Sequence, residues 1–168
     1  MKKFSMKFID HFRHLGLYFL IVICIPLMVY CLFLFKKGYF DLRKGFLIGG
    51  IFFTIYSIPI LLLHLNYYFN NHGDIFNYDS YSGKVIFEKK GKKIKFEKKD
   101  IFKITVFKSW PLSRNDLPVF PWDYYNYAVI ELKNGEIIKL SSLLISELDK
   151  VIKIDNTEIK KRFYAWIV

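Results

Sequence analysis

The sequence predicts a two-helix transmembrane hairpin followed by a mainly β domain. Residues 15–35 form an apolar run of twenty-one residues without a charge, and residues 46–65 form a second run of twenty whose only ionisable group is His64. At about 1.5 Å per helical residue, each run is about 30 Å long, which matches the hydrocarbon core of a bilayer. Beyond residue 66 apolar and polar residues alternate, a pattern typical of strands.

The charge of the chain suits a membrane surface. Its 168 residues carry a net charge of +11, and both the part up to residue 65 and the part after it are basic. Basic residues beside membrane segments favour anionic lipid headgroups and argue against nucleic acid, the other common partner of a basic chain. Because Cys24 and Cys31 both lie in the first apolar run, we expect neither a disulfide framework nor a cysteine-based zinc site in the soluble part.

Residues 1–14 have the spacing of a short amphipathic helix. Phe4, Phe8 and Phe12 recur every four residues among basic side chains, which predicts a helical segment lying on the membrane surface. A signal peptide is the alternative, but the following apolar run is too long for one and no small-residue cleavage site comes after it. We therefore expect this segment to remain as part of the anchor.

The distribution of basic residues indicates on which side the soluble domain lies. The link between the two runs, residues 36–45, holds four Lys and Arg, whereas five lie beside the two ends of the hairpin, counting Lys84. Basic segments stay preferentially in the cytoplasm, so the count favours, by one residue, both ends on the cytoplasmic side. We expect a protein of the inner, cytoplasmic membrane with two spans and a cytoplasmic domain over residues 66–168.

The domain is predicted to begin with a strand, a tight hairpin and a further strand. Residues 74–79 and 101–107 are short runs rich in β-branched and aromatic residues, as strands require. Between them, a hairpin that turns at Lys90-Gly91 brings apolar residues together on one face and opposite charges together on the other. The predicted pairs are Val85–Phe96, Ile86–Lys95, Phe87–Ile94 and Glu88–Lys93.

Residues 109–123 interrupt the strand pattern with prolines and aromatic rings, among them Trp110, Phe120 and Trp122. Long loops in compact domains often carry function. The structural alternative is that these rings fold back to fill the core.

A second hairpin is predicted around Asn134-Gly135, a strong two-residue turn signal that would pair Lys133 with Glu136. Ser146, with Asp149 three residues later, has the spacing of a capping box at the start of a helix. The apolar stripe of that helix would consist of Leu148, Val151 and Ile152. The tail, residues 157–168, is expected to add a helical turn or to return toward the membrane.

These elements resemble a known family. The stretches NYYFNN after the second run, KKDIFKITVFKS within the domain and YAVIELKNGEIIKLSSLL before the helix are similar to bacterial YcxB-type membrane proteins with a pleckstrin-homology-like (PH-like) domain. The resemblance implies about six to seven antiparallel strands in a partly open barrel, capped by a C-terminal helix, with the domain held at the inner membrane. Its motifs are structural, so it implies a fold more than a function.

No motif in the sequence points to catalysis or to a cofactor. A glycine-rich phosphate loop, an H-E-x-x-H pair and a nucleophile elbow are all absent, and the acids alternate with lysines as on a solvated face. His11 and His14 could share a helix face, but no third metal ligand lies within sequence reach. We expect a protein that is not an enzyme and binds neither a metal nor a cofactor.

The candidate site residues point to surface binding. Four lysines crowd the first hairpin turn, where they could contact anionic headgroups or simply keep the domain soluble. We expect a membrane-anchored module that binds a protein partner or an anionic lipid surface. The alternatives are an accessory or assembly subunit of a larger membrane complex, and an immunity-type protein that neutralises a toxin at the membrane. The candidate lipid- or partner-binding residues are Lys89, Lys90, Lys92, Lys93, Trp110, Phe120 and Trp122.

Overall fold

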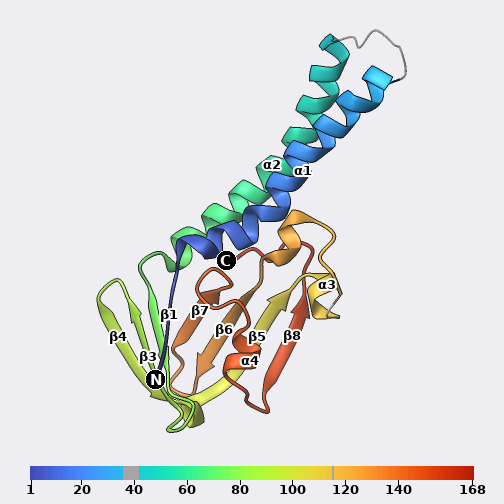
Figure 1. Ribbon diagram of the computed structural model, residues 1–168. Coiled ribbons are helices and arrows are strands. Elements are labelled where there is room, and N and C mark those ends of the chain that lie inside the picture. Colours follow the sequence, from blue (N-terminus) through green and yellow to red (C-terminus); the bar gives the residue numbers. More distant parts are fainter. Residues whose placement is uncertain (36–41, 115) are drawn as a thin grey trace.

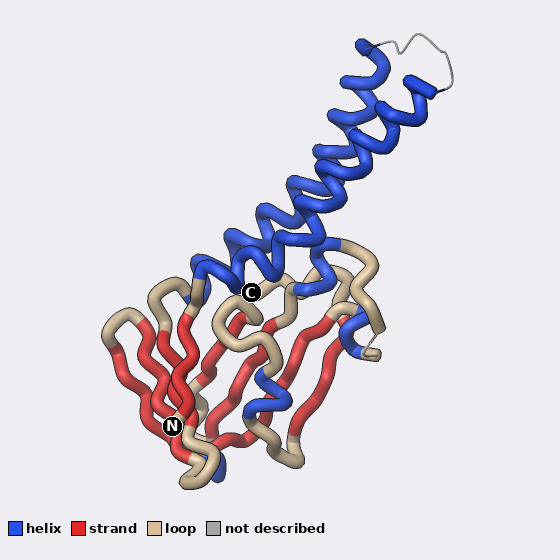
Figure 2. Tube along the Cα trace, in the orientation of Figure 1, coloured by secondary structure: helices blue, strands red, loops and turns tan. Residues whose placement is uncertain are grey.

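The computed structural model describes residues 1–35, 42–114 and 116–168, and shows two four-stranded sheets from which two long helices project (Figures 1 and 2). The strands are β1 Lys2–Ser5, β2 Ile75–Tyr78, β3 Lys84–Lys89, β4 Lys92–Glu97, β5 Ile101–Lys108, β6 Tyr127–Leu132, β7 Ile137–Ser141 and β8 Thr157–Lys161. The helices are α1 Phe8–Phe35, α2 Leu42–Asn71, α3 Trp110–Ser113 and α4 Leu148–Val151, with 3-10 turns η1 Lys98–Asp100 and η2 Pro121–Tyr124. One sheet has the order β1-β2-β3-β4 and the other β7-β6-β5-β8.

The two long helices are inserted between neighbouring strands of one sheet. β1 pairs antiparallel with β2, and α1 and α2 occupy the chain between them. The prediction of one helix over the N-terminal segment was wrong for Phe4, which lies in β1 with its ring centroid 6.3 Å from that of Phe76. It was right from Phe8 onward, where α1 begins. Pairing with the free edge of β2 overrides the helical spacing of the phenylalanines, because that spacing is only a local preference.

The predicted register of the first hairpin is confirmed. Val85 faces Phe96, Phe87 faces Ile94 and Glu88 faces Lys93, as the alternation required. The turn residues Lys90 and Gly91 have φ values of 48° and 82°, the two positive values that a two-residue turn matched to the strand twist needs. The predicted strands at residues 74–79 and 101–107 are present as β2 and β5.

The second hairpin differs by one residue from the prediction. Leu132, not Lys133, faces Glu136, since the Leu132 N–H donates to the Glu136 carbonyl at 2.9 Å. The turn therefore contains three residues and ends in Gly135, whose φ is 86°, the left-handed residue of such turns. The core decides this register, because it sets buried Ile130 opposite buried Ile138, whereas the predicted register would set Ile130 opposite Lys139.

The C-terminal part contains a much shorter helix than expected. α4 has four residues, begins after Glu147 and has no side-chain cap, so the capping box at Ser146 was wrong. Leu148 and Ile152 of the predicted stripe are buried. The next segment forms β8, which pairs in parallel with β5. The domain is thus a pair of packed sheets rather than a barrel closed by a long terminal helix.

Two apolar clusters hold these elements together. The first lies between the sheets and includes Phe76, Phe87 and Ile130. The second joins α1 and α2 to η2, to the outer face of β6 and to the C-terminal tail, and includes Ile60, Tyr67 and Trp122. Because consecutive strand residues point to opposite faces, β6 contributes Ile130 to the first cluster and Tyr127 to the second.

Candidate functional site

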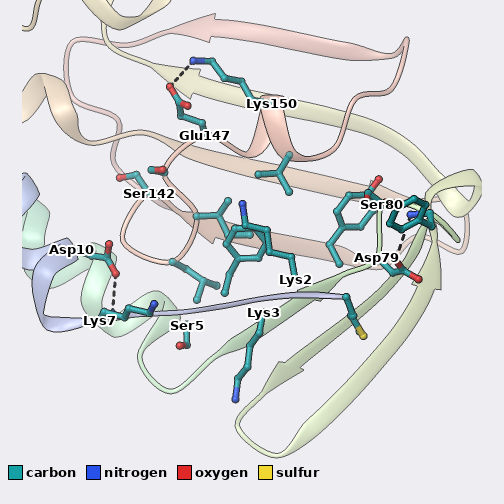
Figure 3. Close-up of a pocket in the computed structure, with 18 residues that line it drawn as sticks. Lys2, Lys3, Ser5, Lys7, Asp10, Asp79, Ser80, Ser142, Glu147 and Lys150 are labelled. Atoms are coloured by element: carbon teal, nitrogen blue, oxygen red, sulfur yellow. Dashed lines mark hydrogen bonds and ion pairs between the residues drawn. The ribbon is translucent and has the colours of Figure 1, made fainter.

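A groove of about 890 Å³ opens between β1 and residues 142–151 (Figure 3). β1 is an edge strand, so the side of its backbone that faces away from β2 has no strand partner among the described residues. Leu144 and Ile145 contribute buried apolar side chains to the groove. We call this feature the β1 groove.

Two lysines of the β1 groove have no ion-pair partner among the described acids. Glu147 pairs with Lys150 at 2.7 Å, whereas Asp10 and Asp79 accept hydrogen bonds from uncharged donors, the Lys7 backbone N–H at 2.9 Å and the Ser82 hydroxyl at 2.6 Å. The ammonium groups of Lys2 and Lys7 form no ion pair with any described acid, and Lys2 lies 5.1 Å from the Phe4 ring centroid. Lys2 points across the groove, while Lys3 points to the other face of β1 (Figure 3). Lys2 and Lys7 are therefore available to acidic groups of an extended ligand.

Buried polar contacts fasten the two long helices to the domain. His14 of α1 contacts the Ser142 hydroxyl through Nε2 at 2.8 Å. His64 of α2 contacts the Tyr125 hydroxyl through Nδ1 at 2.7 Å and Nδ1 of His11 through Nε2 at 2.9 Å. Burial lowers the pKa of His14 to about 4 and raises the pKa of Tyr125 above its ordinary value. His14 and Tyr125 are therefore neutral connectors at physiological pH.

The end of α2 is held by further hydrogen bonds to backbone groups. Asn71, which is fully buried, accepts the Ser141 N–H at 2.7 Å and donates to the Lys139 carbonyl at 3.0 Å. One turn earlier, the Tyr67 hydroxyl donates to the Ala165 carbonyl at 2.6 Å. The C-terminal tail thus returns to α2, and the helices cannot swing freely about the domain.

Lysines crowd the first hairpin turn, and only some of them lack an ionic or hydrogen-bond partner. We call this feature the lysine turn; it consists of Lys89, Lys90, Lys92 and Lys93. Lys89 donates to the Asn70 carbonyl at 3.2 Å and lies 4.0 Å from the carboxylate of Asp74. Lys93 pairs with Glu88 at 3.5 Å. Lys90 and Lys92 are exposed and form no ion pair with a described acid. The lysine turn therefore offers two unpaired cations at its tip.

The three aromatic residues predicted as binding residues, Trp110, Phe120 and Trp122, differ in how deeply they are buried. Trp122 is buried, and its ring stacks on that of Phe120 at 4.8 Å between centroids, so the core-filling alternative is correct for Trp122. Trp110 is 52% exposed and has two cations over its ring, the guanidinium of Arg114 at 5.7 Å and the ammonium of Lys161 at 5.2 Å. Of these residues, only Trp110 is thus largely exposed at the surface.

Sequence reasoning missed the β1 groove and the histidine contacts. β1 was not recognisable as a strand, since four residues give too short an alternation. His14 and Ser142 meet across 128 residues of chain, and no local pattern signals such a pair. Among the described residues no three His, Cys, Asp or Glu side chains lie close enough together to hold a metal ion.

Comparison with known proteins identifies the class of fold. A family model described as a PH domain matches residues 3–153, a range that covers both long helices and, apart from Lys2 of β1, every strand of the two sheets except β8. The chain therefore belongs to this PH domain family, whose members are typically non-catalytic binding modules. No curated protein and no solved structure gives a significant match.

One helix within the described residues has the length and composition to cross a membrane. It covers Gly49–Asn71, within α2, with a mean hydropathy of 1.5. A helix in the core of a soluble protein can pass the same test, but it would be mostly buried. Only 18% of the most apolar part of this helix is buried.

Proposed function

We propose that this protein is a membrane-anchored PH-type binding module with no catalytic activity. The parts of residues 15–35 and 46–65 that do not pack against η2 and the C-terminal tail would span the cytoplasmic membrane, and the sheets would lie in the cytoplasm. The β1 groove would bind an acidic segment of a protein partner. The narrower similarity to YcxB-type proteins is part of the same proposal.

The exposed apolar surface of α1 and α2 is the observation that carries the membrane anchor. Large apolar side chains on both helices are about half exposed or more, which is costly in water but favourable in lipid. A soluble monomer rarely exposes so large an apolar area. These side chains include Leu20, Ile23, Leu27 and Met28 on α1, and Leu47, Ile51, Phe53, Ile55 and Ile58 on α2.

The open edge of β1 and the unpaired Lys2 and Lys7 beside it carry the binding role. A strand edge can accept an extended peptide through backbone hydrogen bonds, and side-chain pockets beside it give selectivity. Lys2 and Lys7 would attract acids of that peptide. Tethering at the membrane would raise the effective concentration of the module near partners at the same surface.

One experiment tests both parts of the proposal. Membranes from cells that make the full chain are washed with alkaline carbonate and with high salt, and then extracted with detergent. We expect the protein to stay in the pellet through both washes, because its helices lie in the hydrocarbon. Release into either supernatant would contradict the membrane anchor.

The detergent extract then tests the groove. The full chain is purified with its partners, and Lys2→Glu/Lys7→Glu is compared with the control Lys3→Glu, whose side chain leaves β1 on the opposite face from that of Lys2. We expect the double variant to lose a partner that the control keeps. A partner that is kept by both variants and is itself an integral membrane protein would favour the second candidate, a subunit of a larger membrane complex joined through the helices.

A further inference from the structure

A mixed aromatic and basic surface lies beside the long helices, apart from the β1 groove. At its centre the exposed ring of Trp110 carries the cations of Arg114 and Lys161 within 6 Å, a distance at which a cation is attracted to the ring face. We call this the aromatic–basic surface. Its members are Trp110, Arg114, Leu117, Val119, Phe120, Lys161, Phe163 and Tyr164.

Much of the apolar part of this surface faces outward. Leu117 is 87% exposed and Val119 66%, and the ring of Phe163 is 55% exposed. Leaving these side chains in water forgoes the favourable free energy of burying them. An apolar environment is therefore expected to cover them.

A rigid base supports the exposed rings. The ring of Phe163 lies 5.8 Å from buried Trp122 and 6.2 Å from Phe120, and that of Tyr164 lies 5.3 Å from Trp122. Trp122 in turn lies 5.9 Å from Tyr56 of α2. The aromatic–basic surface is thus packed against the side of the helix that would enter the membrane.

The position of this surface differs from that of the lysine turn. Figure 1 shows α3 on the side toward which α1 and α2 rise, whereas the turn between β3 and β4 lies on the opposite side of the domain. The connections at His14, His64 and Asn71 hold the helices to the sheets, so this arrangement is fixed. With the helices in a bilayer, the aromatic–basic surface lies nearer the lipid than the lysine turn does.

We propose that the aromatic–basic surface lies in the lipid–water interface, where Arg114 and Lys161 bind the phosphates of anionic phospholipids. Trp and Tyr rings collect at this depth in membrane proteins because one end of the side chain is apolar and the other polar. Basic side chains near an anionic leaflet add electrostatic attraction. The inference rests on the proposed membrane anchor and replaces the lysine turn with a different lipid contact.

The test uses the full chain reconstituted in vesicles of phosphatidylcholine and phosphatidylglycerol. A single cysteine carries an environment-sensitive fluorophore at one of three sites: native Cys31 of α1 in a Cys24→Ser background, or Leu117→Cys or Lys92→Cys in a Cys24→Ser/Cys31→Ser background. Leu117 and Lys92 are both exposed, so neither substitution disturbs the core. Nitroxide-labelled lipids then report which sites contact the membrane, and at what depth.

The three sites distinguish failure of the inference from failure of the anchor. We expect quenching at residue 31 by deep nitroxides, quenching at residue 117 by shallow ones, and none at residue 92. Quenching at residue 31 without quenching at 117 would overturn the inference and leave the anchor intact. No quenching at residue 31 would overturn both, and quenching at 92 but not 117 would restore the lysine turn as the lipid contact.

The role of Arg114 and Lys161 is tested separately, with the fluorophore at residue 117. We expect shallow-nitroxide quenching at this site to be stronger with phosphatidylglycerol than in phosphatidylcholine alone. Arg114→Gln/Lys161→Gln should abolish that difference, and the matched control Lys90→Gln/Lys92→Gln should retain it. An unchanged difference in the first variant would show that these two cations do not bind the headgroups.

Discussion

His14 is a histidine that the fold keeps uncharged. Its Nδ1 donates to the Asp10 carbonyl at 2.7 Å, so the neutral ring must use Nε2 as the acceptor for the Ser142 hydroxyl. The Ser142 oxygen is also 3.4 Å from the Asn126 N–H, which donates to it. Protonation of Nε2 would break this chain of donors and acceptors, and burial of the extra charge would add to the cost.

We expect the stability of the protein to rise with pH between about 4 and 6.5 and then to level off. Burial lowers the pKa of His14 to about 4 from its ordinary 6.5, so the unfolded chain binds more protons within this window. The contribution of His14 is about 3 kcal/mol at neutral pH, and it disappears as the pH falls toward 4. Thermal unfolding in detergent micelles across this range measures the effect.

A His14→Gln variant is the control for this pH dependence. Glutamine cannot titrate, so the slope between pH 4 and 6.5 should decrease by about one proton relative to the unsubstituted protein. Identical pH profiles for the two proteins would show that His14 is not the group that titrates.

β1 is the element on which the fold of the first sheet depends. Its four residues complete the edge of that sheet and bring the start of α1 against the end of α2, since β1 and β2 are neighbours. Phe4 packs against the core between the sheets. A fragment that begins after α2 would lack this strand and leave the edge of β2 unpaired.

The Phe4→Ala substitution should therefore destabilise the domain, by roughly 2 kcal/mol given that the ring is only partly buried. Lys3→Ala, at the next position in the same strand, should change stability by less than about 0.5 kcal/mol. Limited proteolysis and thermal unfolding of the full chain in detergent measure both. Equal stability of the two variants would show that Phe4 does not contribute to the core.

At the scale of the whole molecule, the helices and the sheets form one unit. The chain enters α1 from β1 and leaves α2 near β2, so the two helices are tied to adjacent strands of one sheet. The second apolar cluster and the histidine contacts add to this connection. Since both ends of the helical pair meet the same sheet, the domain must lie entirely on one side of a membrane that the pair spans.

That side is expected to be the cytoplasm. A membrane-impermeant amine reagent applied to intact cells should leave the lysines of residues 84–99 unmodified, and the same reagent after lysis should modify them. Mass spectrometry of the purified protein measures both. Modification before lysis would place the sheets outside the cell and reverse the proposed orientation.

The sequence by itself determined the elements that are specified by residues close together in the chain. The alternation through residues 84–97 and the left-handed turn at Lys90-Gly91 specify the first hairpin down to its register, because facing residues lie within about a dozen positions of each other. The uninterrupted apolar runs likewise determined the long helices. The aromatic residues of 109–123 could be recognised as a group, but their composition did not show that Trp110 faces outward and Trp122 inward.

Only the tertiary structure decided the features that depend on distant partners. β1 is a strand because β2 offers it an edge seventy residues away, the second hairpin takes its register from the core, and residues 157–161 form β8 because β5 is beside them. The same holds for the β1 groove and the aromatic–basic surface, each of which joins segments that are tens of residues or more apart in the chain. Burial and backbone pairing with remote strands outweigh local preferences of a few tenths of a kcal/mol per residue, and such partners exist only once the chain has folded.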